Sequence, residues 1–575
     1  MPASYSPLTD LSIADVIAIA RDGGQVALLG STNDNPDQDS RAAERLARIQ
    51  HSAAWVQAAM HDVEAAAAEG RDPTAYYGIN TGFGDNAGRA TFRRVEEAEA
   101  LSRKLLLSHT IGVGESLPEA VVRAALLIRV VSLAQGYSGV RVEVINTLIA
   151  MLNQRVYPLV PSQGSLGASG DLAPLAHLVI PISAPLPGED ATIPGATGYC
   201  YLNGQRVSGA EAMAAAHIPQ IRLGAKEGVA LINGTAISTA IAALALYDAY
   251  ELVAASQIAL TMTIEAMRGF RDAFLPYLNR LRSDSQAHAA ATILDYLQGS
   301  TLVRGDIAHD LSVNDGPPQD PYSIRCAPTV FGAVLATLHH IDSTISAELH
   351  AVTDNPLVFA SDDPTDPDYL PRHTKVISGG NFHGAPIGYV MDFLSIALTD
   401  LGSIAERRIF LLTDPKLNRG LPPFLIAEPA EQIGLNSGLM IAQYTAASLV
   451  SENKTLAHPA SVDSIPSSAN REDHVSMSTI AARQAAQIVV NTRRVVALEL
   501  LCAAQALSLR LEQQPDLTPG WGARCALDFI RSLEIAPGRL LDVIREDTPL
   551  PPYVEALTAA IPALVADLAS GNKNA

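Results

Sequence analysis

The sequence predicts a mainly α-helical protein, in which a long antiparallel helical bundle follows a smaller, loop-rich N-terminal part. No proline occurs between Pro219 and Pro276 or between Pro466 and Pro515, and both runs are rich in alanine and leucine. Because proline interrupts helices, proline-free runs of this length favour helices well beyond the usual globular length. Aromatic residues make up only 5% of the chain, which favours close helix packing over a β-sandwich. Long helices of this kind bury their apolar stripes on one another, as in a bundle.

Individual helices follow from composition and spacing. In the run that begins after Pro466, the pairs Ile488–Val489 and Val495–Val496 lie one heptad apart, as on a helix with one apolar stripe. We predict further helical stretches at 41–69, 118–154, 327–353 and 387–412. In the first part of the chain, glycine-rich loops at 78–88 and 164–170 interrupt these stretches.

Two further segments are predicted as exposed connections. Residues 184–206 contain three prolines and four glycines, which indicates a surface loop or a small hairpin. Residues 361–374 contain four aspartates and three prolines and are predicted as a loop. We divide the chain into three parts, which are an N-terminal part with the two glycine-rich loops (1–215), a central bundle (216–514) and a C-terminal helical cap (515–575).

Composition limits the classes of function. The net charge of −20 argues against nucleic-acid binding, because no basic surface is available to neutralise phosphates. The uncharged stretch 229–247 contains asparagine and threonine, and we expect a buried helix rather than a membrane span. The N-terminus carries charged residues where a signal peptide needs an apolar run, so we expect a cytoplasmic protein. Four cysteines are far apart and form no metal-type pair; they are Cys200, Cys326, Cys502 and Cys525.

The loop Gly167-Ala168-Ser169-Gly170 can build an electrophile from its own backbone. The amide nitrogen of Gly170 would attack the carbonyl carbon of Ala168, and glycines on both sides remove Cβ atoms that would block the approach. Loss of water from the ring and then from the Ser169 hydroxyl leaves an exocyclic methylidene on an imidazolone. No side chain is a comparable electrophile, so the ring would take the place of a cofactor. By itself an Ala-Ser-Gly tripeptide is more often an ordinary turn.

The wider run Gly164–His177 resembles the signature of the histidine and aromatic amino acid ammonia-lyases, which carry the 4-methylidene-imidazol-5-one (MIO) group. Similar motifs extend from about Tyr77 to Arg494. The resemblance implies that Ala168, Ser169 and Gly170 form MIO autocatalytically, with no metal or nucleotide. It also implies a fumarase/aspartase-like helical architecture and a homotetramer in which each active site collects residues from three subunits.

Elimination of ammonia requires an electrophile, a base at the β-carbon and a cation for the carboxylate. Tyr77 heads the glycine-rich run Tyr77–Gly84, and its loop would have to stabilise a phenolate for it to act as a base. The resemblance implies that Tyr77 is the catalytic base. Arg325 can hold a carboxylate through two parallel hydrogen bonds, and the resemblance assigns the substrate's α-carboxylate to it.

Four more residues match family positions in the site. Tyr322 lies three residues before Arg325, on the same side if this segment begins a helix. By resemblance Tyr322 joins the catalytic groups and Gln319 lines the pocket. Asn233 and Phe382 match positions beside the MIO ring, and both are expected to contact substrate.

The substrate is predicted from two further motifs. His109 ends the run Leu105–His109, and histidine lyases carry Ser-His there, whereas phenylalanine enzymes typically carry Phe-Leu and many tyrosine lyases His-Leu. Glu452, in a Ser-Glu-Asn-Lys run, resembles a glutamate of the histidine enzymes that contacts the imidazole. A carboxylate can accept from an imidazole N–H, but it would have no partner facing a phenyl ring. The motifs therefore predict conversion of L-histidine to trans-urocanate and ammonia.

Alternatives within the family remain open. Tyrosine 2,3-aminomutases also carry Ser-His, and there a tyrosine resembling Tyr444 helps to hold the phenol. A phenylalanine or tyrosine ammonia-lyase is the other alternative, since the loop at 84–89 and the insertion at 184–206 depart from the histidine enzymes. The fumarase and aspartase superfamily is disfavoured because its Met-Pro loop with a lysine is absent. A non-catalytic scaffold is disfavoured by the intact Ala-Ser-Gly with Tyr77 and Arg325. No histidine spacing predicts a metal site, and no glycine loop predicts a nucleotide.

Overall fold

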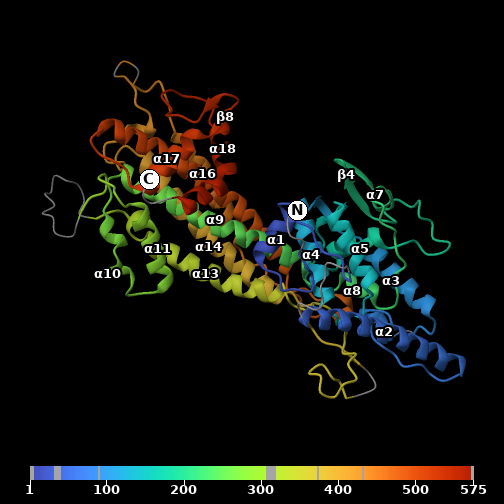
Figure 1. Ribbon diagram of the computed structural model, residues 1–575. Helices are drawn as coiled ribbons and strands as arrows, with labels where there is room; N and C mark the ends of the chain where they lie inside the picture. Colours follow the sequence, from blue (N-terminus) through green and yellow to red (C-terminus); the bar gives the residue numbers. More distant parts are fainter. Residues whose placement is uncertain are drawn as a thin grey trace. The chain divides into compact units, whose positions relative to one another are not determined.

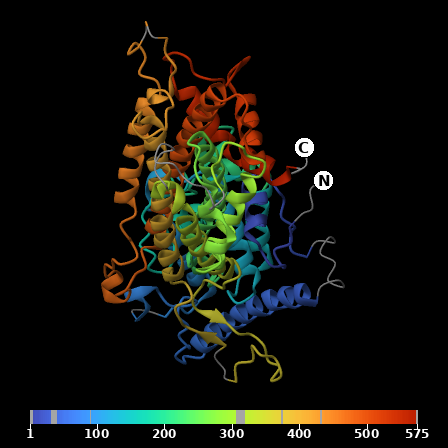
Figure 2. The same cartoon turned by 90° about the vertical axis from the view of Figure 1, so that its left-hand side faces the viewer.

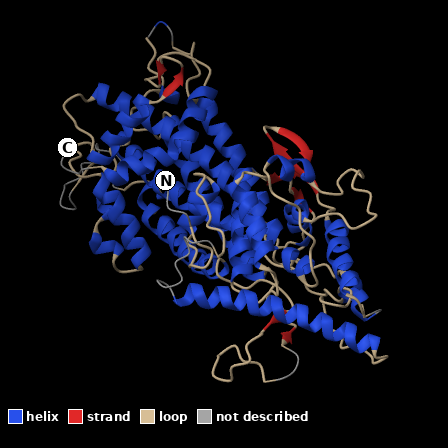
Figure 3. Cartoon of the chain, turned by 45° about the vertical axis from the view of Figure 1, so that its right-hand side comes forward, coloured by secondary structure: helices blue, strands red, loops and turns tan. Residues whose placement is uncertain are grey.

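The computed structural model describes residues 5–30, 40–88, 91–305, 319–371, 375–429, 431 and 433–571. Helices dominate these residues, and strands occur only in small two- or three-stranded sheets (Figure 3), which confirms the predicted fold class.

The chain divides into two compact units, each assembled from three separate segments. Unit 1 comprises residues 1–244, 342–391 and 459–483, and unit 2 comprises residues 245–341, 392–458 and 484–575. This division cuts across the three consecutive parts predicted from the sequence, because its boundaries fall inside long helices. Those helices are α9 (Ala236–Ala266), α13 (Ala327–Glu348), α14 (Ala385–Thr413) and α16 (Ser478–Gln513).

Unit 1 is built around α4, whose residues are all buried from Val121 to Ala134. A helix that is buried on every side belongs in a protein core. The helices that lie entirely in unit 1 are α1 (Ile13–Ala20), α2 (Ser40–Ala68), α3 (Val95–His109), α4 (Glu119–Ala134), α5 (Val142–Asn153), α6 (Leu172–Val179), α7 (Gly209–Ala215) and α8 (Glu227–Ile232). Short 3-10 helices include η1 (Gly84–Gly88) and η7 (Ser468–Asn470).

Three small antiparallel sheets belong to unit 1. β1 (Val113–Ser116) pairs with β3 (Pro161–Gln163), β2 (Tyr157–Pro158) pairs with β4 (Tyr199–Leu202), which pairs with β5 (Gln205–Ser208), and β6 (Leu357–Val358) pairs with β7 (Val376–Ile377). The β4–β5 hairpin confirms the hairpin predicted within 184–206. Its two-residue turn, Asn203-Gly204, has positive φ at both positions, as the twist of a tight hairpin requires. The predicted loop at 361–374 has no helix or strand up to Pro371, and residues 372–374 lie outside the described residues.

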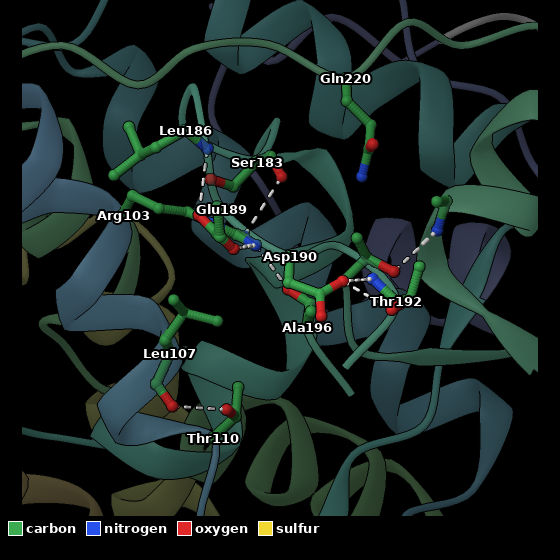
Figure 4. Close-up of polar contacts among 12 residues, drawn as sticks. Arg103, Leu107, Thr110, Ser183, Leu186, Glu189, Asp190, Thr192, Ala196 and Gln220 are labelled. Carbon is green, nitrogen blue, oxygen red and sulfur yellow. Dashed lines mark hydrogen bonds and ion pairs between the residues drawn. The ribbon is translucent and has the colours of Figure 1, made fainter. Parts of the chain in front are cut away.

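The rest of the 184–206 insertion is fastened to α3 by one buried arginine (Figure 4). The guanidinium of Arg103, 2% exposed, donates to both carboxylate oxygens of Glu189. It also donates to the carbonyl oxygens of Ser183, at 3.2 Å, and Ala196, at 2.6 Å. Arg103 therefore holds the start, middle and end of this loop at once.

Unit 2 contains the packed halves of the long helices (Figure 1, Figure 2). Further elements are α10 (Pro276–Asn279), α11 (Asp284–Tyr296), α12 (Tyr322–Arg325), α15 (Met440–Leu456), α17 (Trp521–Ser532), α18 (Pro551–Ser570), β8 (Glu534–Ala536) and β9 (Arg539–Leu540). Arg408 of α14 is fully buried against Glu499 of α16, and its guanidinium also lies 6.0 Å from the ring of Phe331 of α13. His340 of α13 contacts Phe393 of α14. Positions 331 and 340 thus meet 408 and 393, so α13 and α14 are antiparallel.

The predicted apolar stripe of α16 is buried, with Val495 and Val496 both 0% exposed. Two polar neighbours, Asn491 and Thr492, are buried as well. They form hydrogen bonds with Asn453 of α15, at 3.0 and 3.2 Å. This part of the bundle core is therefore polar and satisfied, which the apolar pattern alone does not predict.

Three predicted helical stretches are shorter or divided. The stretch 118–154 forms two helices, because Gly136 and Gly139 between them take positive φ. The run after Pro219 breaks at 233–235, and the run after Pro466 becomes helical only at Ser478.

By length and composition alone, three described helices, α9, α14 and α18, suffice to cross a membrane. In their most apolar windows 78%, 61% and 28% of the residues are buried inside the protein. For α9 this supports the expectation that 229–247 is part of a buried helical region.

Candidate active site

The Ala-Ser-Gly loop is compressed against residue 234. Gly167 and Gly170 have φ of 67° and 71°, a region that favours glycine. A Cβ on Gly170 would lie 2.1 Å from the Gly234 carbonyl oxygen. The Gly234 N–H donates to the Ser169 carbonyl, at 3.2 Å, and the Asp171 N–H donates to the Gly234 carbonyl, at 2.7 Å. Only glycine fits at position 170, and the loop is held from both sides.

Asp171 anchors the end of this loop. Its buried carboxylate accepts from the Ser238 N–H at 2.8 Å, from the Ser238 hydroxyl at 3.0 Å and from the Thr479 hydroxyl at 2.5 Å. Burial raises the pKa of Asp171. Helix α6 begins at Leu172, so its positive N-terminal end lies next to the loop.

Tyr77 lies at the start of the glycine-rich loop Tyr77–Gly84. Its side chain is partly exposed and meets Phe83 edge-on, with ring centroids 6.3 Å apart. The Gly84 N–H donates to the Tyr77 hydroxyl at 3.5 Å. A Cβ on Gly84 would lie 2.3 Å from the Ser468 hydroxyl oxygen, so this loop rests directly on η7. The phenol therefore lies at an accessible edge with a backbone donor beside it.

A carboxylate that the sequence analysis missed, Glu472, lies beside the Ala-Ser-Gly loop. Its Oε1 accepts from the Ser169 hydroxyl at 3.1 Å, and its Oε2 accepts from the Ser467 hydroxyl at 2.7 Å. The segment before it is irregular, with positive φ at Ser468, Ala469 and Asn470. Several non-glycine residues in that region are a sign of a functional constraint.

His109 has a ring that the charge of Glu472 influences. Its Nδ1 lies 2.8 Å from the Leu105 carbonyl oxygen, which can only accept, so Nδ1 carries the proton and Nε2 keeps its lone pair. Burial lowers the pKa of His109, and the Leu105 hydrogen bond and the charge of Glu472 oppose this only in part. The ring is therefore neutral near pH 7.

His177 holds the chain just after His109. Its Nε2 accepts from the Gly112 N–H at 3.1 Å. Burial lowers the pKa of His177 to about 4. This histidine, which follows the Ala-Ser-Gly loop on α6, is therefore a neutral hydrogen-bond acceptor that joins α6 to the segment after α3.

Asn233 is held by residues of the 353–355 segment. Its Nδ2 donates to the Asn355 carbonyl at 3.1 Å and to the Asp354 carboxylate at 3.4 Å. Asp354 also pairs with Lys226 at 2.6 Å, and both side chains are 0% exposed. The Oδ1 of Asn233 is buried and has no hydrogen-bond partner in the described part of the chain. This orphaned acceptor lies next to Gly234, which grips the loop.

Phe382 lies in a turn supported by the same segments. The Gly379 N–H donates to Oδ1 of Asn355 at 2.7 Å. The residue after Phe382, His383, stacks on His474 with ring centroids 5.8 Å apart and an interplanar angle of 5°. Phe382 is therefore adjacent in sequence to a histidine stack whose other member, His474, lies two residues after Glu472.

The other predicted residues belong to unit 2. Gln319 is exposed, and Tyr322 of α12 is 70% exposed. The Arg325 guanidinium lies over the Tyr322 ring, 4.5 Å from its centroid. Tyr444, 60% exposed, and the exposed Glu452 both lie on α15. The predicted residues thus form two sets, one in each unit.

The residues around 168–170 fit the MIO group. The contact with Gly234 permits only glycine at position 170. The Ser169 hydroxyl donates to Glu472, and the buried Oδ1 of Asn233, next to Gly234, has no hydrogen-bond partner among the described residues. Within the described ranges, no group of three histidine, cysteine or acidic residues could hold a metal ion.

Comparison with known proteins defines the class. A family model described as aromatic amino acid lyase matches residues 11–532. The chain belongs to this family.

Curated relatives include the histidine ammonia-lyase of Symbiobacterium thermophilum, 44% identical over 552 residues that cover 96% of this chain and 95% of the relative. The histidine ammonia-lyase of Bacillus subtilis is 48% identical over 441 residues, which cover 76% and 80%. Similar solved structures include a tyrosine aminomutase from Streptomyces globisporus, with 29% identity, TM-score 0.80 and coverage of 99% and 98%. Histidine ammonia-lyase from Trypanosoma cruzi has 30% identity, TM-score 0.78 and coverage of 98% and 95%.

Proposed function

We propose that this protein is an ammonia-lyase that converts L-histidine to trans-urocanate and ammonia. The main support is a pair of acceptors, the carboxylate of Glu472 beside the Ala-Ser-Gly loop and Nε2 of His109, whose ring is influenced by the charge of Glu472. An imidazole ring has N–H groups for such acceptors, whereas a phenyl ring has none. The histidine ammonia-lyase relatives support the same substrate.

The proposed cofactor is MIO, formed autocatalytically from Ala168, Ser169 and Gly170. It would supply an electrophilic carbon, which no side chain of the chain provides. The cradle of Gly234 contacts supports this, because it holds the backbone of the three residues in a tight bend. The N-terminal end of α6 adds a positive field at the loop.

The proposed base is Tyr77, which removes the β-proton of substrate. The Gly84 N–H beside its hydroxyl would stabilise phenolate more than phenol. Arg325 is proposed to bind the α-carboxylate, with Tyr322 under its guanidinium and Gln319 at the pocket wall. Asn233 and Phe382 are proposed to line the ring.

We propose Glu472 as an imidazole contact in addition to Glu452. Ring formation removes the Ser169 hydroxyl, which frees the Glu472 oxygen that accepts from it. The carboxylate would then have an open acceptor position close to His109. Glu452 is exposed on α15, like Tyr444 of the same helix, and its contact with the imidazole remains part of the proposal.

A tyrosine 2,3-aminomutase or a phenylalanine or tyrosine ammonia-lyase is the second candidate. The observation that favours it is the tyrosine aminomutase structure, which matches 99% of this chain at TM-score 0.80. Tyr444 on α15 would then help to hold the phenol. A phenol O–H can also be accepted by His109, so the hydrogen-bond inventory alone favours histidine only over phenylalanine.

The proposed assembly is a homotetramer in the cytoplasm, with active sites shared between subunits. Tyr389, Phe393 and Ile396 are about half exposed and lie on one face of α14. Ile441 and Tyr444 of α15 are also more than half exposed. Apolar side chains grouped in this way are typical of a surface covered by another chain.

The function is tested with the purified protein and L-histidine, L-tyrosine and L-phenylalanine, each offered separately. Ultraviolet absorbance follows the conjugated acids, and chromatography detects β-amino acids. Urocanate as the main product supports the proposal, and coumarate, cinnamate or β-tyrosine as the main product refutes it. In parallel, intact mass of the wild type should be two waters below the encoded mass, whereas Ser169→Ala should show no loss of the second water and no activity.

The carboxylate assignment is tested with Glu472→Gln and the matched variant Glu452→Gln. Hydrogen bonds to charged groups contribute about 1.5–3 kcal/mol, so Glu472→Gln should lower kcat/KM for histidine about 10- to 100-fold. Glu452→Gln should lower it by a similar factor, because its carboxylate is proposed to contact the same imidazole ring. A variant that changes kcat/KM less than about twofold would remove that glutamate from the proposed imidazole contacts.

A further inference from the structure

We propose that Asp320 is a positioning residue for Arg325, and that it acts through an ion pair with Arg419 at the end of α9. This rests on the proposed role of Arg325 in binding the substrate carboxylate. It concerns how a short, exposed turn can hold a guanidinium in a fixed orientation.

The element that carries Arg325 is too short to fix its own orientation. Helix α12 is a single turn, Tyr322–Arg325, and only Cys326 separates it from α13, so contacts with neighbouring elements hold it in place. Tyr322 at its start is 70% exposed, so packing of its ring within the chain restrains it little. The turn must therefore be fixed from outside itself.

Besides its stacking on the Tyr322 ring, the guanidinium is oriented by one backbone hydrogen bond. Its Nε donates to the carbonyl oxygen of Asp320 at 3.0 Å. No ion pair of Arg325 occurs among the residues that the structure describes, so its two terminal nitrogens keep their donors for a ligand. A carboxylate binds such a pair of donors through two parallel hydrogen bonds. The place of the Asp320 backbone thus determines where that carboxylate must lie.

The side chain of Asp320 fixes that backbone. It is buried, and its residue is 3% exposed. Its Oδ2 accepts from the Phe270 N–H at 2.7 Å, and its Oδ1 accepts from Nη2 of Arg419 at 2.7 Å. Both oxygens therefore have a short contact with a group from a distant part of the chain.

Arg419 connects this carboxylate to a rigid element. Its Nη1 donates to the carbonyl oxygens of Met267 and Arg268, at 2.9 and 3.1 Å, just beyond the C-terminal end of α9. Arg510 donates from Nε to the Ala266 carbonyl at 2.8 Å, and from Nη2 to the Arg419 carbonyl at 2.9 Å. Cations at a helix C-terminus are stabilised by the carbonyl groups there. A 31-residue helix thus supplies the fixed reference for Arg325.

The consequence is selective. When Asp320 loses its charge, Arg419 keeps its contacts with the carbonyl oxygens of Met267 and Arg268. Its contact with Asp320 weakens, so the α12 turn and the Arg325 guanidinium shift. A misplacement of about 1 Å can cost about 100-fold in rate or binding of the group concerned. Only the carboxylate of a ligand depends on this guanidinium, so the imidazole contacts should be spared.

The test compares two inhibitors of the purified, folded protein, urocanate and 4-vinylimidazole. These two ligands differ only in the carboxylate. The variants are Asp320→Asn, Arg419→Lys and the exposed control Asp516→Asn. Lysine keeps the charge but cannot bridge the carboxylate and the carbonyls as a guanidinium does. Melting temperatures confirm that each variant is folded.

Asp320→Asn should weaken urocanate binding about tenfold or more and change 4-vinylimidazole binding less than about twofold. KM for histidine should rise in parallel, with a smaller change in kcat, and Asp516→Asn should change neither ligand. If Asp320→Asn does not fold, Arg419→Lys should give the same selective loss. Equal losses for both ligands, or no loss for either, would overturn the positioning role.

Arg325→Gln separates this proposal from the function on which it rests. A selective loss of urocanate in Arg325→Gln, with an unselective effect of Asp320→Asn, overturns the positioning alone. An unselective effect of Arg325→Gln overturns both. If the wild type acts on tyrosine, 4-coumarate and 4-vinylphenol replace the two imidazole ligands, and the same selectivity decides.

Discussion

Replacing Gly170 with alanine is expected to stop ring formation while leaving the rest of the fold in place. The new Cβ would lie 2.1 Å from the Gly234 carbonyl oxygen and 2.3 Å from its carbonyl carbon. An ordinary Cβ contact begins at about 3.4 Å, so the two strands of backbone must separate by more than an ångström. No flexible side chain is involved, so the backbone itself must move.

The size of the effect follows from this displacement. Holding alanine at φ of 71° costs about 1–2 kcal/mol. A displacement of about 1 Å in a reacting group costs about 100-fold in rate, and here the reacting atoms are the Gly170 nitrogen and the Ala168 carbonyl carbon. Ammonia release should fall at least about 100-fold, and intact-mass analysis should show most chains without the loss of two waters.

Gly188 provides the matched control. It also has positive φ, 83°, but a Cβ there would meet no atom within 4 Å. Gly188→Ala should therefore cost only the conformational strain, lower the melting temperature slightly, and keep the mass deficit and activity. If Gly170→Ala also retains the mass deficit and full activity, the contact with Gly234 does not shape the loop and the reasoning is refuted.

Two further predictions concern stability. Arg103→Met should lower the melting temperature strongly, because removing one partner of a buried ion pair costs about 3–5 kcal/mol. Glu189→Gln should lower it less. An unchanged melting temperature in Arg103→Met would contradict the role of Arg103 in anchoring the insertion. Burial lowers the pKa of His177 to about 4, so the unfolded chain binds this proton at higher pH than the folded one. Stability is then full above about pH 6.5 and falls as the pH drops toward 4. His177→Gln still accepts from the Gly112 N–H but cannot titrate, and its stability should fall less over this range; parallel curves would contradict the assignment.

The helical class and the tight bend of the Ala-Ser-Gly loop could be predicted from local sequence. Proline-free runs and the Val495–Val496 stripe depend on spacing along one helix. The glycines at 167 and 170 directly indicate a tight backbone bend. The division of 118–154 was harder to see, because Gly136 and Gly139 are too few to outweigh the surrounding apolar residues until their positive φ is known.

The missed carboxylate has a different cause. Glu472 lies 303 residues from Ser169, and contacts over such distances leave no periodic pattern in one sequence. It also lies in a proline-free run, which the sequence analysis treated as helix. The structure makes Ser468 to Asn470 irregular instead, and Met477, the last residue before α16, also has positive φ. A cluster of polar residues there, between Pro466 and the first buried alanines, was the only local signal.

The hydrogen bonds that hold Asp171 determine when, during protein synthesis, the Ala-Ser-Gly loop can take its final shape. Its carboxylate accepts from residue 479, 308 positions downstream. While the ribosome is still producing the middle of the protein, that hydroxyl does not exist, and neither does the irregular segment that holds Ser169. Formation of the proposed ring should therefore have to wait until translation has passed the last of these contacts.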